Sequence, residues 1–186
     1  LTDAELERLE DGHQLEGQPC LAVIRASVVN QDGRSANLTA PNGKSQEKLL
    51  RAALHKAELR PSDVDMIETH GTGTSLGDPI EVGALQAVFG GDQRDAPLAI
   101  GAVKSNVGHL ELAAGMAGLI KSILVLQHRH LTPNLHMTKV NTKLPLSNFA
   151  AALPGADGLS LSKANQKSTL FGGVGSFGFG GTNARG

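Results

Sequence analysis

The chain alternates short apolar runs with longer segments in which apolar residues recur at helical spacing. The short runs predict strands at 20–29, 62–69 and 98–103, and a fourth that begins at Ser168. Helical spacing predicts a short acidic helix at 3–11 and longer helices at 45–58, 78–89 and 109–127. From residue 20 onward the order is β-α-β-α-β-α-β, which is typical of a layered α/β fold.

Residues with special backbone preferences mark where the elements begin and end. We expect Ser45 to cap the second helix, and Asp78 to cap the third with Pro79 at its first position. The long apolar run at 109–127 carries three charged or titratable side chains, so we expect a buried helix rather than a membrane span. Residues 133–154 contain three prolines and predict an irregular connector.

Composition removes several classes of function. The 186 residues carry a net charge of -1 and contain no Trp or Tyr, which argues against a nucleic-acid-binding protein. A single cysteine, Cys20, excludes an internal disulfide framework and fits a reducing compartment. We therefore expect a soluble intracellular protein, in the cytoplasm or a plastid. The chain begins without Met and stops just after a glycine-rich stretch, so we expect a piece of something longer.

Three glycine-rich loops follow predicted strands, at 70–74, 104–109 and 175–183. If those strands are parallel in one sheet, their loops meet outside its carboxyl edge, where ligands bind in layered α/β folds. His70, Lys104 and His109 would then surround one point together with free backbone amides. Such a set predicts an acid/base site that stabilises a developing negative charge.

The two histidines differ in their setting. His109 is expected at the start of the long helix, where the helix dipole and burial both favour neutral imidazole that donates to an oxyanion; a structural histidine near a cap is the alternative. His70 ends a strand beside glycines, and Thr72 and Thr74 place hydroxyls next to it or satisfy their own turn. Glu68 should point to the same side as His70 and pair with Lys104, unless it forms a plain buried ion pair.

Other motifs carry little weight. The spacing Gly173-x-Gly175-x-x-Gly178 lacks the helix and acidic partner of a dinucleotide site, and Gly43-Lys44-Ser45 lacks the first glycine of a phosphate loop. The histidines after the long helix do not have zinc-ligand spacing, so we expect no metal site. Cys20 has the setting of a packing residue. The inferred site therefore lacks a nucleophile.

The assembled motifs resemble the C-terminal half of a β-ketoacyl synthase, of the type found in modular polyketide synthases. The resemblance covers nearly the whole chain, in the family's order. Its four segments are AVIRASVVNQDGRSANLTAPNG, DVDMIETHGTGTSLGDPIEVGAL, GAVKSNVGHLELAAGMAGLIKSILVLQH and GSFGFGGTNA. The resemblance implies that residues 1–186 form the C-terminal portion of a ketosynthase domain. It also implies half of a thiolase-like fold, with a mixed sheet layered between helices and a homodimer when complete.

The resemblance further implies an acyltransferase of the 3-oxoacyl synthase type, acting in polyketide or fatty acid synthesis. The reaction would be decarboxylative Claisen condensation, with the extender carried on the phosphopantetheine arm of an acyl carrier protein and no cofactor bound directly. His70 and His109 would belong to a Cys-His-His triad, with Lys104 nearby and paired with Glu68. Thr72 and Thr74 would contact the pantetheine arm. The backbone amide of Phe179 would contribute to the oxyanion hole, and its ring would gate the acyl pocket. Further substrate contacts would come from Phe177, Gly178 and Gly180.

Two departures from the family pattern limit the inference. The nucleophilic cysteine belongs to an N-terminal half that is absent here, and Cys20 aligns with a strand instead. The family's loop commonly continues TNAH, whereas this chain has Arg185, which we expect to alter an outer loop contact rather than the triad. We favour a part of a working ketosynthase, completed by its N-terminal half. A non-catalytic scaffold with this fold is the main alternative, and a thiolase-fold enzyme without decarboxylation is a weaker one.

Overall fold

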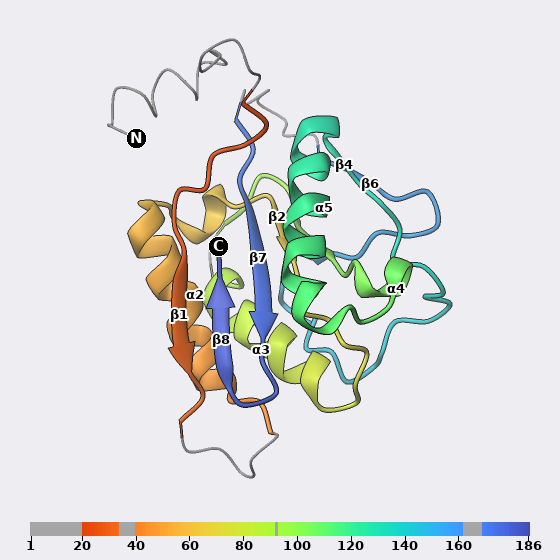
Figure 1. Cartoon of the computed structure of the whole chain (residues 1–186). Coiled ribbons are helices and arrows are strands. Elements are labelled where there is room, and N and C mark those ends of the chain that lie inside the picture. The colour runs from red at the N-terminus through yellow and green to blue at the C-terminus, as the bar shows by residue number, and fades with distance from the viewer. Residues whose placement is uncertain (1–19, 34–39, 92, 162–168) are drawn as a thin grey trace.

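A six-stranded mixed sheet forms the centre of the protein (Figure 1). The computed structural model describes residues 20–33, 40–91, 93–161 and 169–186. In order across the sheet, the strands are β1 (Val28–Gln31), β8 (Thr182–Arg185), β7 (Gly172–Phe177), β2 (Met66–Glu68), β3 (Leu98–Gly101) and β5 (Ala151–Ala152). β7, β2, β3 and β5 are parallel, whereas β8 and β1 are antiparallel to their neighbours. The parallel strands therefore deliver their following loops to one edge, as the sequence predicted.

Helices cover both faces of the sheet. On one face, α2 (Gly43–Ala57) packs against α3 (Gly77–Phe89), and α5 (Ala114–His128) lies across β7 and β2 on the other (Figure 1). Adjacent residues of β2 consequently enter different cores. Ile67 joins the buried cluster beneath α3, whereas Met66 joins the smaller cluster beneath α5. A strand covered on both sides is apolar without alternation, which explains why its short run is so clear in the sequence.

Glycines let β7 approach β2 closely. A Cβ added at Gly172 would lie 2.9 Å from Met66 Sδ, and one at Gly173 would lie 3.0 Å from Ile67 Cδ1. Side chains at these two positions would collide with fully buried residues of the neighbouring strand. The glycine-rich composition of this segment is therefore a packing requirement of the sheet.

Two helix starts differ from the predictions. Asn42, not Ser45, caps α2, because its side chain accepts the amides of Lys44 and Ser45 at 3.1 and 3.3 Å. α3 begins at Gly77, so Asp78 lies inside the first turn rather than at the cap. The Asp78 carboxylate instead reaches back to accept the Gly73 amide at 3.1 Å, which ties the preceding loop to the helix.

The long helix and the first strand are both shorter than predicted. α5 begins at Ala114 rather than at 109, because Gly108 and Glu111 have φ values of 78° and 49°, which an α-helix cannot accommodate. A 3-10 turn, η2 (Glu111–Ala113), precedes it. Strand β1 begins only at Val28, which pairs with Arg185 at the end of β8, so residues 20–27 have no strand to pair with among the described residues.

The C-terminal segment forms a hairpin that the sequence did not predict. β7 runs to Phe177 and returns through a tight turn into β8, with Gly181 at φ 84°. The connector at 133–154 is largely irregular but contributes β5, and β4 (His130–Leu131) pairs with β6 (Leu159–Ser160) in a small separate ladder. The expected helix at 3–11 lies outside the described residues. Within the described ranges, no helix combines the length and apolarity needed to cross a membrane.

Candidate active site

His70 lies where the chain leaves β2 and turns toward α3. The strand ends at Glu68, and the Thr69 amide donates to the Gly101 carbonyl at 2.8 Å. Gly71 has a φ of 48°, and a Cβ there would lie 2.9 Å from Ala102, so a glycine fits this turn. The Glu81 carboxylate of α3 accepts the amides of His70 and Gly71 at 2.8 and 3.0 Å. A buried acid of α3 thus fixes the backbone that carries His70.

The three glycine-rich loops converge, as the sequence predicted. Lys104 Nζ lies 3.5 Å from His70 Nδ1 and also donates to the His70 carbonyl. The Phe177 amide donates to the same Nδ1 at 3.3 Å. The His70 and His109 rings meet edge to face, with centroids 5.6 Å apart. Side chains from all three loops therefore surround one imidazole.

These contacts define the protonation of His70. Burial, and then the charges of Lys104 and His109, lower its pKa from 6.5 to about 4. Because Nδ1 accepts the Phe177 amide, the single proton of the neutral ring lies on Nε2. Near neutral pH His70 is therefore an uncharged hydrogen-bond donor.

His109 has a different environment from the one predicted. It is exposed and lies in the loop before η2, five residues ahead of α5, so it does not sit at the start of that helix. The Glu111 amide donates to His109 Nδ1 at 3.0 Å. A local backbone hydrogen bond, rather than the dipole of the long helix, therefore selects the tautomer with its proton on Nε2.

The predicted pairing of Glu68 with Lys104 is wrong. Glu68 Oε2 lies 2.9 Å from Lys121 Nζ of α5, and Oε1 accepts the Val103 amide. Both side chains of this ion pair are buried. The strand alternation used for the prediction ends at Glu68, because the chain turns at Thr69, so Glu68 and His70 face different neighbours.

Two acids of α3 belong to this site and were not predicted as site residues. Burial raises the pKa of Glu81 and that of Asp78, and the amides that each carboxylate accepts oppose the rise. Burial lowers the pKa of Lys104, against the opposing charges of Glu81, Glu68 and Asp78. The available signal was their position: two acids three residues apart at the start of a helix, directly after a glycine-rich loop.

The family model described as "Beta-ketoacyl synthase, C-terminal domain" matches residues 21–138. This chain belongs to the β-ketoacyl synthase family. It is 48% identical over 180 residues to a component of the phenolphthiocerol/phthiocerol polyketide synthase of Mycobacterium tuberculosis, covering 96% of the chain and 9% of that protein. It is 51% identical over 149 residues to polyketide synthase GfsA of Streptomyces halstedii, covering 80% of the chain and 2% of that protein.

Solved ketosynthases share the fold. The chain superimposes on the oxazolomycin ketosynthase domain OzmH KS7 of Streptomyces albus with a TM-score of 0.81 and 37% identity, covering 97% of this chain and 30% of that one. The ketosynthase from module 6 of the bacillaene synthase of Bacillus subtilis superimposes with a TM-score of 0.83 and is 35% identical. That match covers 97% of this chain and 32% of the other. The expected thiolase-like fold, with its mixed sheet and covering helices, is confirmed. The chain thus spans about a third of these ketosynthases.

The substrate-binding residues predicted for this ketosynthase segment lie in the two glycine-rich loops at 70–74 and 175–183. Thr74 Oγ1 accepts the Gly77 amide at 3.0 Å, so it satisfies its own turn, and it lies 3.5 Å from Thr72 Oγ1. The Phe177 ring packs against His70, with centroids 5.5 Å apart. Phe179, at the hairpin tip, is 84% exposed, and its amide has no acceptor among the described residues. The Gly178 amide is bonded to the Thr182 carbonyl, and Gly180 is exposed beside Phe179.

Arg185 does not belong to an outer loop, contrary to expectation. It lies in β8 and is 4% exposed, and a Cβ added at Gly175 would lie 2.7 Å from its Nη1. Burial lowers the pKa of Arg185 to about 10, and the charge of Glu81 opposes that change. The departure from the family pattern therefore places a buried cation inside the sheet.

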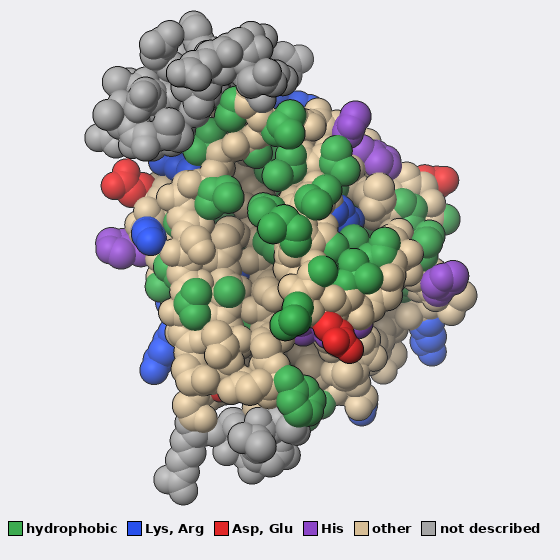
Figure 2. Space-filling model, viewed as in Figure 1, with side chains coloured by type: hydrophobic (Ala, Val, Ile, Leu, Met, Phe, Trp, Pro, Cys, Tyr) green, Lys and Arg blue, Asp and Glu red, His purple; other side chains and the backbone are tan. Residues whose placement is uncertain are grey.

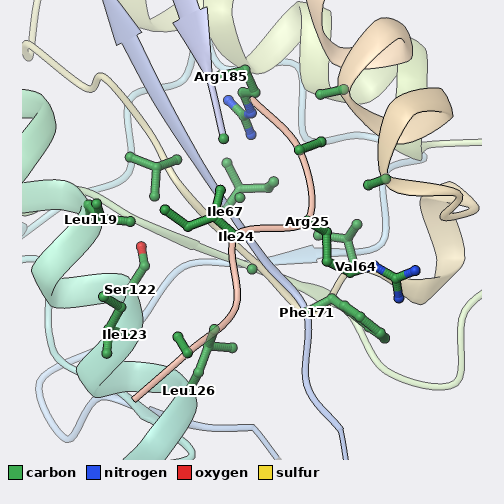
Figure 3. Close-up of a pocket in the computed structure, with 18 of the residues that line it drawn as sticks. Ile24, Arg25, Val64, Ile67, Leu119, Ser122, Ile123, Leu126, Phe171 and Arg185 are labelled. Atoms are coloured by element: carbon green, nitrogen blue, oxygen red, sulfur yellow. The ribbon is translucent and has the colours of Figure 1, made fainter. Parts of the chain in front are cut away.

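A cleft of about 570 Å³ opens between α5 and the segment that leads into β1, and neither His70, Lys104 nor His109 lines it. Figure 3 shows Leu119 and Ile123 of α5 on one side of it and Val64 and Phe171 on the other. Cys20 lies at its rim, is exposed, and is not among the contacts of either histidine. No cluster of three metal-binding side chains occurs in the part of the chain that the structure describes.

Proposed function

We propose that this chain is the histidine-bearing C-terminal half of a ketosynthase that condenses an acyl thioester with a malonyl-type extender. The observation that carries the proposal is the pair of imidazoles, His70 and His109, each with Nδ1 accepting a backbone amide. Both therefore offer an Nε2–H on neighbouring rings beside Lys104. Hydrogen-bond donors placed in this way are suited to stabilising an oxyanion without transferring a proton to it.

The proposed reaction begins with an acyl chain held as a thioester on a cysteine of the other half. The bond between Cα of the extender and its carboxylate breaks, carbon dioxide leaves, and the electron pair forms an enolate. His70 and His109 donate to the enolate oxygen. The enolate carbon then attacks the acyl carbonyl, the carbon–sulfur bond breaks, and the cysteine thiolate is released. Burial, and then the charge of Lys104, keep the pKa of His70 low, so that the ring remains a neutral donor.

The apolar surface of α5 supports completion by an N-terminal half. Leu112 of η2 and Met116, Ile120 and Leu124 of α5 recur at every fourth residue and are at least 48% exposed. Figure 2 shows hydrophobic side chains gathered over this helix, next to a hollow in the surface. A monomeric protein rarely leaves such a continuous apolar stripe in water. We propose that the missing half, which carries the nucleophilic cysteine, covers this stripe and fills the adjoining cleft.

The loops around the histidines would receive the extender. We propose that Thr72 and Thr74 contact the phosphopantetheine arm of an acyl carrier protein. The unpaired amide of Phe179 would then bind the thioester oxygen, and its exposed ring would move as a gate. Phe177, Gly178 and Gly180 would line the substrate side of the same loop. The complete enzyme would be a homodimer.

Reassembly tests the proposal directly. The chain is co-expressed with the N-terminal half of a related polyketide ketosynthase, purified as a complex, and given an acyl thioester and malonyl-acyl carrier protein. We expect release of carbon dioxide and a 3-oxoacyl product, with neither after His70→Ala. A matched control, His55→Ala on the exposed surface of α2, should retain activity. A well-folded complex that loads the acyl group but never condenses it would favour a non-catalytic scaffold.

A further inference from the structure

A buried ion pair joins strand β2 to helix α5, behind the loop that carries Lys104. Glu68, the last residue of β2, is 0% exposed, and Lys121 of α5 is 8% exposed. Glu68 Oε2 and Lys121 Nζ lie 2.9 Å apart. Neither atom has another hydrogen-bond partner among the described residues. Each charge therefore depends on the other for its stability inside the protein.

The other oxygen of the same carboxylate holds the loop. Glu68 Oε1 accepts the backbone amide of Val103, the residue directly before Lys104. Val103 is the N-cap position of α4 (Lys104–Val107), which has no side-chain cap of its own. The amide that begins this turn is thus fixed by an acid from the neighbouring strand.

The structure leaves space for the pair at two glycines. A Cβ added at Gly101 would lie 2.8 Å from Glu68 Oε2 and 3.0 Å from Lys121 Nζ. A Cβ at Gly118 would lie 3.3 Å from Glu68 Cγ. Side chains from the strand before the loop and from the helix after it are therefore excluded from the place where the two charges meet.

From this arrangement we infer that Glu68 and Lys121 are positioning residues for Lys104 and His109. Both site residues lie in the segment that begins at Val103 and enters α5 at Ala114. Glu68 accepts the amide at the start of this segment, and Lys121 belongs to the helix that follows it. Lys121 holds the Glu68 carboxylate in place, and Glu68 orients the first amide of the loop. This inference rests on the proposed condensation, since its catalytic readout is that reaction.

The first test uses the reassembled ketosynthase and Lys121→Met, which leaves the Glu68 carboxylate buried without its cation. We expect faster amide hydrogen exchange at Val103 and condensation reduced about tenfold to a hundredfold, the usual consequence of a small misplacement of catalytic groups. Loading of the acyl group on the cysteine should change less. The matched control is Lys44→Met, which breaks the exposed Lys44–Glu47 pair, whose charged atoms lie 2.8 Å apart.

A neutral double variant separates positioning from packing. Glu68→Gln with Lys121→Met removes both charges but keeps an oxygen that can accept the Val103 amide. We expect it to restore slow exchange at Val103 and most of the condensation rate. If the double variant were as impaired as Lys121→Met, the loss would come from packing and the inference would be overturned. Unchanged exchange and condensation in Lys121→Met would overturn it as well.

A third variant tests the link without disturbing either charge. Val103 has a φ of -61°, which proline adopts, so Val103→Pro removes the amide that Glu68 accepts and replaces the buried valine side chain with a ring of similar size. We expect condensation to fall while acyl loading persists, even if Lys121→Met proves insoluble; full activity in Val103→Pro would contradict the inference. An inactive wild-type complex would instead reject the proposed condensation, and exchange at Val103 would still decide whether the pair orders the loop.

Discussion

The Glu81 carboxylate accepts the backbone amide of His70 at 2.8 Å, from a buried position beneath the site. Its second oxygen accepts the adjacent Gly71 amide at 3.0 Å. An acid of α3 therefore fixes the backbone of a histidine that follows β2. Both bonds are to the main chain, so Glu81 sets the position of the imidazole through the backbone.

Glu81→Ala should destabilise the reassembled ketosynthase and misplace His70. Two part-buried amides lose their acceptor, and each unsatisfied group costs about 1–3 kcal/mol, so we expect a loss of about 2–6 kcal/mol in the free energy of unfolding. Denaturant titration measures this loss. Glu47→Ala, which removes the carboxylate of a surface ion pair in α2, is the control and should change stability by less than about 1 kcal/mol. An equal effect of the two substitutions would contradict the anchoring role.

The protonation of His70 should affect stability in a defined pH window. Its pKa is about 4 in the folded protein and 6.5 when unperturbed, so between these values the unfolded chain binds more protons than the folded one. The free energy of unfolding therefore rises with pH across the window, and this contribution is lost as pH falls toward 4. Denaturation at several pH values, compared with His70→Gln, isolates the slope. An identical pH dependence of the free energy of unfolding in the two proteins would exclude a contribution from His70.

Lys104→Met should raise the pKa of His70. Removal of the cation leaves burial, which is the largest cause of the depression, so the pKa should rise but stay below 6.5. NMR titration of the His70 ring in the complex measures both values. A pKa that does not move on removal of Lys104 would mean that its charge is screened from the ring.

Gly101→Ala should be destabilising because its Cβ would lie 2.8 Å from both Glu68 Oε2 and Leu131 Cδ1, two fully buried groups. Overpacking of this kind costs about 1–3 kcal/mol. The control is Gly83→Ala in α3, where the nearest atom lies 3.9 Å from the added Cβ. That helical substitution should be neutral or stabilising, by up to about 1 kcal/mol. Thermal unfolding of both variants provides the comparison.

Ile120→Glu should weaken association with the N-terminal half, because it places a charge in the middle of the apolar stripe of α5. Sedimentation or size-exclusion analysis of the co-expressed halves measures the fraction assembled. Val140→Glu, at a comparably exposed apolar residue of the connector, should assemble normally. Equal assembly of the two variants would place the interface elsewhere.

Much of the site followed from local pattern. The short apolar runs of β2 and β3 are clear because both strands are covered on two faces, and each leads directly into a loop with a candidate histidine or lysine. Once the strands were taken as parallel, the convergence of His70, Lys104 and His109 followed from the geometry of such sheets. Their order along the chain also carried the family resemblance.

The partners of these residues were decided by tertiary structure. Glu68 pairs with Lys121 because β2 ends before His70, and α5 begins only at Ala114 because Glu111, in its predicted first turn, has a positive φ. Glu81 reaches the His70 amide only because α3 packs beneath the loop. Periodicity along a chain determines which face a residue occupies within one element. Where an element stops, and which side chain of another element fills the space beyond it, depends on the packing of the whole chain.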